Sequence, residues 1–506
     1  MVDHNDHDIV YFAKTDEHEP RRFGIRNADR LQHMYVIGKT GTGKSTLLEN
    51  IAIQDITQKH GMCFIDTYGK TAELLLDYVP KERLRDVIYF SPQDTEAPLV
   101  FNVFEHVAPD QRQFVVRSMV ALFKRLWADV WSSHMEYVLV HTVGALLEYE
   151  DATVLCIDRM LVDADFRTRV LMQVHDPVLR IFWETEFNVG WGDHEQQVVS
   201  HIHAKIRRIA ENHLVRPIVG RPTSTFNVRK AMDERKIMLV NLARGKIGGD
   251  NADLLGEILL VKIYLESIAR TEVTPAEFLA MPPFYLIIDE FQSFVSDSFV
   301  EMLSSARKYK LSFTLAHQYL EQIPLDVQQA ILGNVGTVIS FRIGPHDAKI
   351  MSSVFQLPFR YIENLGFGEL YLSLSIDGTV SPPFFASALP LFLSPEHTHA
   401  REIVEHSRAM YGHEHASIER VLAPSFVTPP PLRRPPGKPP HPKQTAHTVS
   451  LTSLSSRDDS KKEKTTTTNH VALREAIAQV INARNTEQAK NSGEIDANEL
   501  KRIMNE

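Results

Sequence analysis

The chain has 506 residues, of which 43% are apolar, and a formal net charge of −9. This length suffices for about two or three domains with a sizeable core. The negative charge excludes a generally basic nucleic-acid coat, although a local basic channel is compatible with it. The only two cysteines, Cys63 and Cys156, lie in apolar runs, which is typical of a reducing compartment and excludes a disulfide framework.

The sequence favours a soluble, cytoplasmic protein. The first eight residues are acidic and polar, unlike a secretory signal. A membrane span needs about 20 consecutive apolar residues, and the best candidate, residues 254–269, is interrupted by Glu257, Lys262 and Glu266. We therefore predict no transmembrane segment, and we expect any membrane association to be peripheral, through a partner.

A phosphate-binding loop is predicted near the N-terminus. Residues 38–45 read G-K-T-G-T-G-K-S and match G-x-x-x-x-G-K-[ST], with an apolar strand at 33–37 before them and an apolar-periodic helix at 46–58 after them. The glycines let backbone N–H groups point at phosphate oxygens beside a helix N-terminus. Lys44 is expected to reach the β- and γ-phosphates, and the Ser45 hydroxyl to hold Mg²⁺. The expected binding residues for ATP and Mg²⁺ are Gly38, Thr40, Gly41, Thr42, Gly43, Lys44, Ser45 and Thr46.

Short apolar runs that alternate with helical patterns predict a parallel α/β sheet. The gap between the early and the late runs, from about residue 106 to 230, reads as helical throughout, as in residues 110–127. We therefore predict an ATPase domain in two parts, 1–105 and 231–400, interrupted by an all-α insertion at 106–230. The predicted strands after the phosphate loop are residues 62–66, 87–90, 237–242, 284–289, 312–316, 335–343 and 370–374.

The composition changes abruptly near residue 424. Residues 428–442 are dominated by proline, and residues 450–469 are polar, so this part cannot bury enough apolar area to fold. We predict an extension and linker at 401–470, followed by a short helical segment at 471–506. That segment is either a docking element or packs on its own domain, and both interpretations stay open.

A second catalytic element is predicted at residues 284–290, which read F-Y-L-I-I-D-E. A buried strand ends there in paired carboxylates, at the edge where parallel sheets carry their ligands. Asp289 is expected in the Mg²⁺ shell, and Glu290 is expected to polarise the attacking water. The alternative is that two acids merely end a core strand.

Three further residues are candidates around the γ-phosphate. Gln318 follows the strand at 312–316 and is expected to sense the γ-phosphate and orient water. Arg307 is expected to reach the nucleotide of a neighbouring subunit, as arginine fingers do. Arg342 competes for that role because it ends a strand near the same edge. A surface arginine and a satisfied polar glutamine are the alternatives.

Several separate motifs resemble one known group of proteins. They are R-F-G-I-R at 22–26, His33, the phosphate loop, F-I-D-T-Y-G at 64–69, N-V-F at 102–104, F-W at 182–183, V-N-L-A-R-G-K-I-G at 240–248, D-E-F at 289–291 and L-A-H-Q-Y at 315–319. Together they are similar to the HerA/FtsK superfamily of ring-shaped motors. Within it they most resemble the TraG/TraD-like coupling-protein ATPases of conjugative type IV secretion, with their TraM recognition domain. The likeness spans roughly residues 22–390.

The resemblance implies a RecA-like motor domain that carries an all-α domain and assembles as a homohexamer around DNA. Coupling proteins usually begin with transmembrane helices, whereas none is predicted here. This leaves room for a soluble relative, for a separate membrane partner, or for a free DNA-processing motor. The resemblance also implies that the family's phosphate-loop, metal, base, finger and sensor positions are occupied by Lys44, Ser45, Asp289, Glu290, Arg307 and Gln318.

The function that this sequence favours is an ATP-driven DNA translocase. A second hypothesis is a recruitment hub, in which nucleotide gates binding of a relaxase or effector protein. A third is a HerA-like motor for end processing or genome packaging. The expected partners are DNA, further copies of the chain, and relaxase or secretion-channel proteins.

Overall fold

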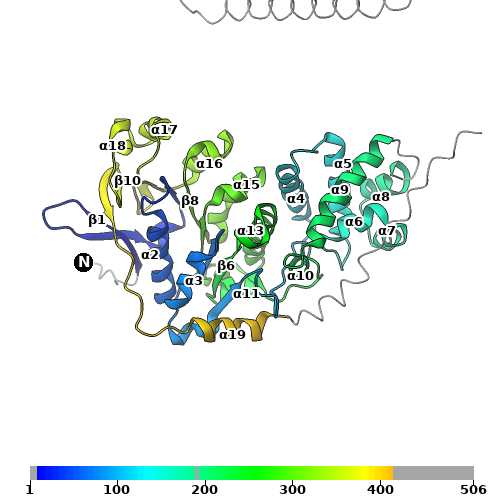
Figure 1. The fold of residues 1–506 in the computed structure, drawn as a ribbon, viewed down its shortest axis with the longest axis horizontal. Coiled ribbons are helices and arrows are strands. Elements are labelled where there is room, and N and C mark those ends of the chain that lie inside the picture. Colours follow the sequence, from blue (N-terminus) through cyan, green and yellow to red (C-terminus); the bar gives the residue numbers. More distant parts are fainter. Residues whose placement is uncertain (1–7, 188–192, 414–506) are drawn as a thin grey trace, which may run out of the picture. The chain divides into compact units, whose positions relative to one another are not determined.

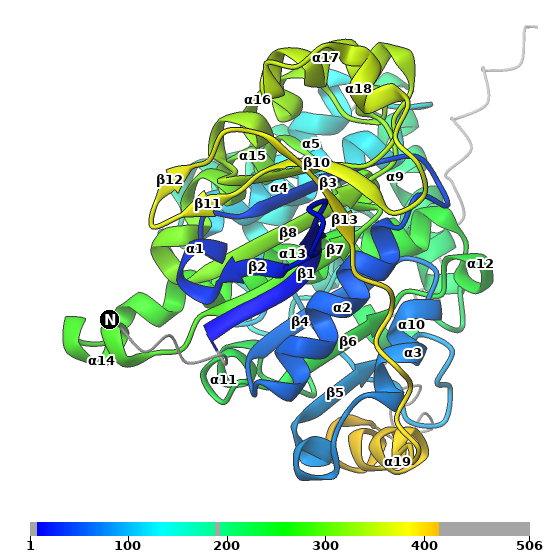
Figure 2. The ribbon, with the colours of Figure 1, turned by 90° about the vertical axis from the view of Figure 1, so that its left-hand side faces the viewer.

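The computed structural model describes residues 8–187 and 193–413, so most of the predicted linker and the C-terminal helical segment lie outside it. Its main sheet has 11 strands in the order β2-β1-β13-β10-β9-β3-β8-β7-β4-β6-β5 (Figures 1 and 2). The strands are β1 (Ile9–Thr15), β2 (Arg22–Arg26), β3 (Met34–Ile37), β4 (Gly61–Asp66), β5 (Val87–Phe90), β6 (Ile237–Asn241), β7 (Phe284–Asp289), β8 (Leu311–His317), β9 (Thr337–Ser340), β10 (Glu369–Ser373) and β13 (Phe384–Ala388).

The strands from β9 to β5 in this order are all parallel. Strand β3 lies between β9 and β8, and β8 in turn pairs with β7. The register opposes Ile37 to His317 and to Ser340, and Asp289 to Ala316. The ends of β3, β7 and β8 therefore meet at one edge of the sheet. The α/β class and the positions of the predicted strands are confirmed.

The last predicted strand, 370–374, differs in direction, because β10 runs antiparallel to β9 and to β13. Strand β10 leads into the short hairpin of β11 (Ser375–Ile376) and β12 (Thr379–Val380), which reverses the chain and makes β10 and β13 antiparallel. Asp377 (φ 50°) and Gly378 (φ 81°) form its turn with positive φ at both central positions. Strand β13 then returns beside β10, and β1 and β2 extend this antiparallel part.

Both faces of the parallel strands are buried, which explains their uninterrupted apolar runs. Met34 and Val36 pack on one face with α2 (Lys44–Thr57) and α3 (Lys70–Asp77). Tyr35 and Ile37 belong to the other face, with α13 (Gly249–Ala269) and α15 (Asp297–Ser305). Figure 2 shows α2 and α3 lying over the strands on the near side of the sheet.

Between β5 and β6 the described residues form helices and loops without a strand, which confirms the helical interruption of the sheet. Ser132 and Asp163 cap two of these helices by accepting hydrogen bonds from the backbone N–H groups of Met135 and Phe166. The buried core of this segment continues into the sheet face that α13 covers. The helices are α4 (Arg112–Leu126), α5 (Ser133–Leu146), α6 (Cys156–Val162), α7 (Ala164–Leu171), α8 (Pro177–Ile181), α9 (Asp193–Glu211), α10 (Arg216–Val219) and α11 (Val228–Asp233).

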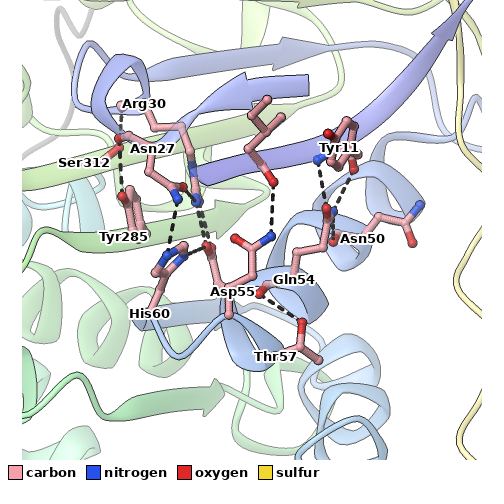
Figure 3. Close-up of polar contacts among 12 residues, drawn as sticks. Tyr11, Asn27, Arg30, Asn50, Gln54, Asp55, Thr57, His60, Tyr285 and Ser312 are labelled. Carbon is pink, nitrogen blue, oxygen red and sulfur yellow. Dashed lines mark hydrogen bonds and ion pairs between the residues drawn. The ribbon is translucent and has the colours of Figure 1, made fainter. Parts of the chain in front are cut away.

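A buried ion pair fixes the far end of α2 to the sheet (Figure 3). Arg30, at the end of α1 (Asn27–Arg30), donates two hydrogen bonds of 2.6 and 2.7 Å to Asp55 of α2, and both side chains are fully buried. The guanidinium also lies 3.7 Å above the ring of Tyr285 in β7. Burial alone would raise the pKa of Asp55, but the charge and hydrogen bonds of Arg30 lower it overall. The helix that begins at the phosphate loop is thus anchored at its opposite end.

The chain after β13 runs along α2 to α19 (Ala400–Tyr411), as Figure 2 shows. Asn50 of α2 donates hydrogen bonds to the carbonyls of Leu389 and Pro390. Helix α19 covers the edge strand β5, where Ser407 Oγ accepts a hydrogen bond from the Tyr89 N–H group. Among the helices of residues 8–187 and 193–413, none combines the length and the apolar character of a membrane span.

Candidate nucleotide-binding site

The phosphate loop connects β3 to α2, as predicted. Gly41 (φ 74°) and Gly43 (φ 116°) adopt conformations that favour glycine, and a Cβ on Gly38 would come within 2.6 Å of Phe341 Cβ. Helix α2 begins at Lys44, directly after Gly43. The first backbone N–H groups of a helix have no partner within it, so this loop presents donors to an anion.

Lys44 is buried within the loop, and its ammonium group faces the loop carbonyls. Nζ donates hydrogen bonds to the carbonyls of Gly38 (2.5 Å) and Lys39 (3.2 Å). Burial lowers the pKa of Lys44, while the carboxylates of Asp289 and Glu290 act in the opposite direction. The cation is therefore held between the loop carbonyls and two acids.

Asp289 ends β7 beside the first turn of α2. Ser45 Oγ donates a hydrogen bond to Asp289 Oδ2 at 3.2 Å. Burial, together with the charge of Glu290, raises the pKa of Asp289 to about 6. A hydroxyl and a partly buried carboxylate with this surplus of negative charge suit a hard divalent cation such as Mg²⁺. The described residues contain no group of three His, Cys, Asp or Glu side chains that could hold a metal ion.

Glu290 is joined to the phosphate loop through Gln318. Thr40 Oγ1 donates a hydrogen bond to Gln318 Oε1 at 2.9 Å, and Gln318 Nε2 donates one to Glu290 Oε1 at 2.7 Å. Glu290 has a φ of 55°, an uncommon conformation for a residue with a side chain. A cavity of about 510 Å³ adjoins Thr40 and Gln318. The structure therefore brings the predicted base and sensor together at the phosphate loop.

The two candidate arginines lie at different edges of the sheet. Arg342 follows β9, and its carbonyl accepts a hydrogen bond from the Lys39 N–H group at 2.9 Å, so it adjoins the chain's own phosphate loop. Arg307 is exposed and precedes β8, at the edge opposite to that loop, where its charge contributes to lowering the pKa of the buried His33, although burial is the larger cause. The structure does not bring Arg307 to the chain's own loop.

Several polar residues around the site were not predicted from the sequence. Asp66 at the end of β4 accepts hydrogen bonds from the N–H groups of Thr71 and Ala72 and caps α3. Gln292 Nε2 donates a hydrogen bond to Glu290 Oε2 at 2.6 Å. Its only sequence signal is its position two residues after Glu290. Arg244 donates a hydrogen bond at 3.3 Å to the Oγ atom of Ser293, the residue that follows Gln292.

Residues 283–355 match a family model described as the TraM recognition site of TraD and TraG. This range runs from the start of β7 to the end of α17 (Pro345–Phe355). The predicted resemblance to this branch is thereby confirmed. This segment of the chain is therefore similar to TraG/TraD-like proteins. The site residues within the matched range are Asp289, Glu290, Arg307, Gln318 and Arg342. No match was found among curated proteins.

The fold of the chain is also similar to that of solved structures. The unbound bacterial conjugative coupling protein TrwBdeltaN70 is similar with a TM-score of 0.52 and 14% identity, over 74% of this chain and 89% of that chain. The plasmid coupling protein TrwB in complex with ADP and Mg²⁺ has a TM-score of 0.51 and 16% identity, over 74% and 90%. VirB4 of Thermoanaerobacter pseudethanolicus has a TM-score of 0.50 and 14% identity, over 77% and 98%. At these identities the likeness establishes the P-loop fold.

Proposed function

We propose that this protein binds ATP with Mg²⁺, hydrolyses it and uses the energy to translocate DNA. The observation that carries the ATPase part is the chain of hydrogen bonds from Thr40 through Gln318 to Glu290. It connects a residue of the phosphate loop to a carboxylate that follows β7. A loop that only bound phosphate would not require this connection.

Each residue has a distinct role in the proposed reaction. The loop N–H groups and Lys44 bind the phosphates, and Lys44 exchanges its carbonyl partners for phosphate oxygens. Ser45 and Asp289 would hold Mg²⁺, which would neutralise charge on the phosphates. Glu290 accepts the proton of the attacking water, and Gln318 orients that water against the γ-phosphate.

The DNA part of the proposal rests on the resemblance to coupling proteins, and the position of Arg307 supports a ring of subunits. An arginine at the edge opposite to the loop can serve a nucleotide only in another copy of the chain, as a ring of subunits permits. We therefore propose a homohexamer in which Arg307 reaches the neighbour's nucleotide, with DNA in the central pore. Docking on a secretion channel would be peripheral, through a membrane partner.

A second candidate function is nucleotide-gated recruitment of a relaxase or another partner protein. The match of residues 283–355 to the TraM recognition site favours it, because that description names a protein partner. The same range contains Glu290 and Gln318, so partner binding and hydrolysis would be coupled through shared elements.

Steady-state ATP hydrolysis separates the two candidates. The purified full chain is assayed alone, with single-stranded DNA and with double-stranded DNA, and Lys44→Ala is the control. Strong stimulation by DNA that depends on Lys44 supports the translocase. Hydrolysis that depends on Lys44 but is indifferent to DNA contradicts the translocase and favours recruitment.

A further inference from the structure

Two glutamines from different loops hold the Glu290 carboxylate. Gln318, after β8, donates to Oε1 at 2.7 Å, and Gln292 donates to Oε2 at 2.6 Å. Gln318 also accepts a hydrogen bond from Thr40 of the phosphate loop, whereas within residues 8–187 and 193–413 the Gln292 side chain is hydrogen-bonded to Glu290 and not to that loop. The two oxygens of one carboxylate are therefore fixed from two sides.

Gln292 stands on a rigid support. It belongs to the short 3₁₀ turn η5 (Phe291–Phe294), whose first and last side chains are each only 1% exposed. The Phe291 ring packs edge-on against His317 at 4.9 Å. Phe294 packs so closely on α13 that a Cβ on Gly256 would lie 2.2 Å from its ring. A side chain held on such a turn can fix the orientation of its partner closely.

Stability alone does not explain an amide at position 292. Gln292 Oε1 is buried and has no hydrogen-bond partner in the described part of the chain. A buried acceptor without a partner destabilises the folded state. A methionine has nearly the same shape and carries no such acceptor. Compared with methionine, the amide of Gln292 adds the hydrogen bond to Glu290. Glu290 itself has an uncommon backbone conformation.

We propose that Gln292 is a positioning residue for Glu290. In the proposed reaction the Gln318 side chain, which donates a hydrogen bond to Glu290, must instead bind the attacking water and the γ-phosphate. Gln292 then remains the group that keeps the carboxylate in place, with Oε1 of Glu290 directed at the site. The inference rests on the ATPase activity proposed above and adds a second glutamine to it.

The test compares Gln292→Met, which removes the amide but keeps the shape, with the same substitution at the exposed Gln329 of α16 (Leu325–Asn334). ATP affinity, kcat and the melting temperature are measured for the full chain. Because loss of orientation at a reacting group costs up to about 100-fold, we expect Gln292→Met to lower kcat about 10- to 100-fold. We expect ATP affinity to stay within about twofold and the melting temperature not to fall. Gln329→Met should match the wild type in every measurement.

Two results would overturn the inference. One is a Gln292→Met kcat equal to or above that of the wild type. The other is a parallel fall of kcat, ATP affinity and melting temperature, which would make the role structural. Lys44→Ala and Glu290→Gln, assayed beside it, test the underlying activity separately. If these two abolish hydrolysis while Gln292→Met does not lower it, only the role of Gln292 fails; if they leave hydrolysis intact, the proposed ATPase site itself fails.

Discussion

Ser45 Oγ donates a hydrogen bond to Asp289 Oδ2 across 3.2 Å and joins the first turn of α2 to the end of β7. These residues are 244 positions apart in the chain, and only the parallel pairing of β3, β8 and β7 brings them together. The contact holds a carboxylate beside the phosphate loop, where it is costly unless a cation is bound. The site thus favours the binding of a cation from solution beside Asp289.

Replacement of Asp289 is predicted to have opposite effects on stability and on binding. Asp289→Asn removes a buried charge, so the nucleotide-free protein should become about 1–3 kcal/mol more stable. It also removes a proposed ligand, so Mg²⁺-dependent ATP affinity should fall at least about tenfold. Urea unfolding and nucleotide titration with and without Mg²⁺ measure the two effects. Loss of stability in the nucleotide-free variant would contradict this account.

The stability of the nucleotide-free protein is predicted to depend on pH through Asp289. Burial raises the pKa of this carboxyl group from its ordinary value of 3.8, which we take for the unfolded chain, to about 6 in the folded protein. Between these values the folded state holds a proton that the unfolded state releases, so stability falls as pH rises through about 4 to 6. The total change is about 3 kcal/mol for this group. The free energy of unfolding is measured against pH for the wild type and for Asp289→Asn, and the difference between the two curves gives the contribution of Asp289. Curves with equal slopes would refute the prediction.

Replacement of Glu290 is predicted to impair hydrolysis, whereas replacement of Lys44 is predicted to impair nucleotide binding. Glu290→Gln should retain ATP but turn it over about 10²–10⁴ times more slowly, because it removes the proton acceptor. Lys44→Ala should lose nucleotide affinity itself. Equilibrium binding and single-turnover hydrolysis distinguish the two variants. Normal hydrolysis by Glu290→Gln would show that another group is the base.

Arg307 is predicted to act between subunits, and co-expression can show it. Arg307→Ala and Lys44→Ala should each be inactive alone, since fingers contribute about 10³–10⁵ in rate. In mixed rings, a subunit with intact Lys44 can meet the intact Arg307 of a neighbour, so activity should return in part. Arg342→Ala is the matched control, because Arg342 adjoins its own loop and cannot be complemented in this way. Equal behaviour of the two mixtures would contradict the assignment.

The Arg30–Asp55 pair is predicted to stabilise the fold. Asp55→Asn leaves a fully buried guanidinium without its counter-charge, which should cost about 3–5 kcal/mol. The exposed pair of Arg26 with Asp377 provides the control, and Asp377→Asn should cost no more than about 1 kcal/mol. Chemical denaturation of the two variants compares them. A cost below about 1 kcal/mol for Asp55→Asn would show that the pair does not anchor α2.

The sequence predicts the parallel half of the sheet well, because each strand is a local apolar run followed by a helical pattern. It does not predict β1, β2 and β13, which belong to the antiparallel part of the sheet, where the pairing of β1 with β13 joins residues as distant as Ala13 and Ala388. The prediction of a parallel β10 was wrong: α17 lies between β9 and β10, so the connection is long enough for a parallel crossover, yet the two strands are antiparallel. The roles of Ser45, Asp289, Glu290 and Gln318 stay predictions, although the structure brings these residues together.

Two features of the site could be recognised only from the structure. A residue before a parallel strand lies at the edge opposite to the strand's end, so the place of Arg307 follows only once β8 is known to lie parallel beside β3. Gln292 carries no recognisable spacing, and only its contact with Glu290 reveals it.

We propose that ATP hydrolysis at this site moves the protein along DNA. The most direct measurement is displacement of a triplex-forming strand from a duplex by the full chain with ATP and Mg²⁺. We expect displacement by the wild type and none by Lys44→Ala or Glu290→Gln. Absence of displacement by a wild-type protein that hydrolyses ATP in the presence of the same DNA would contradict the translocase.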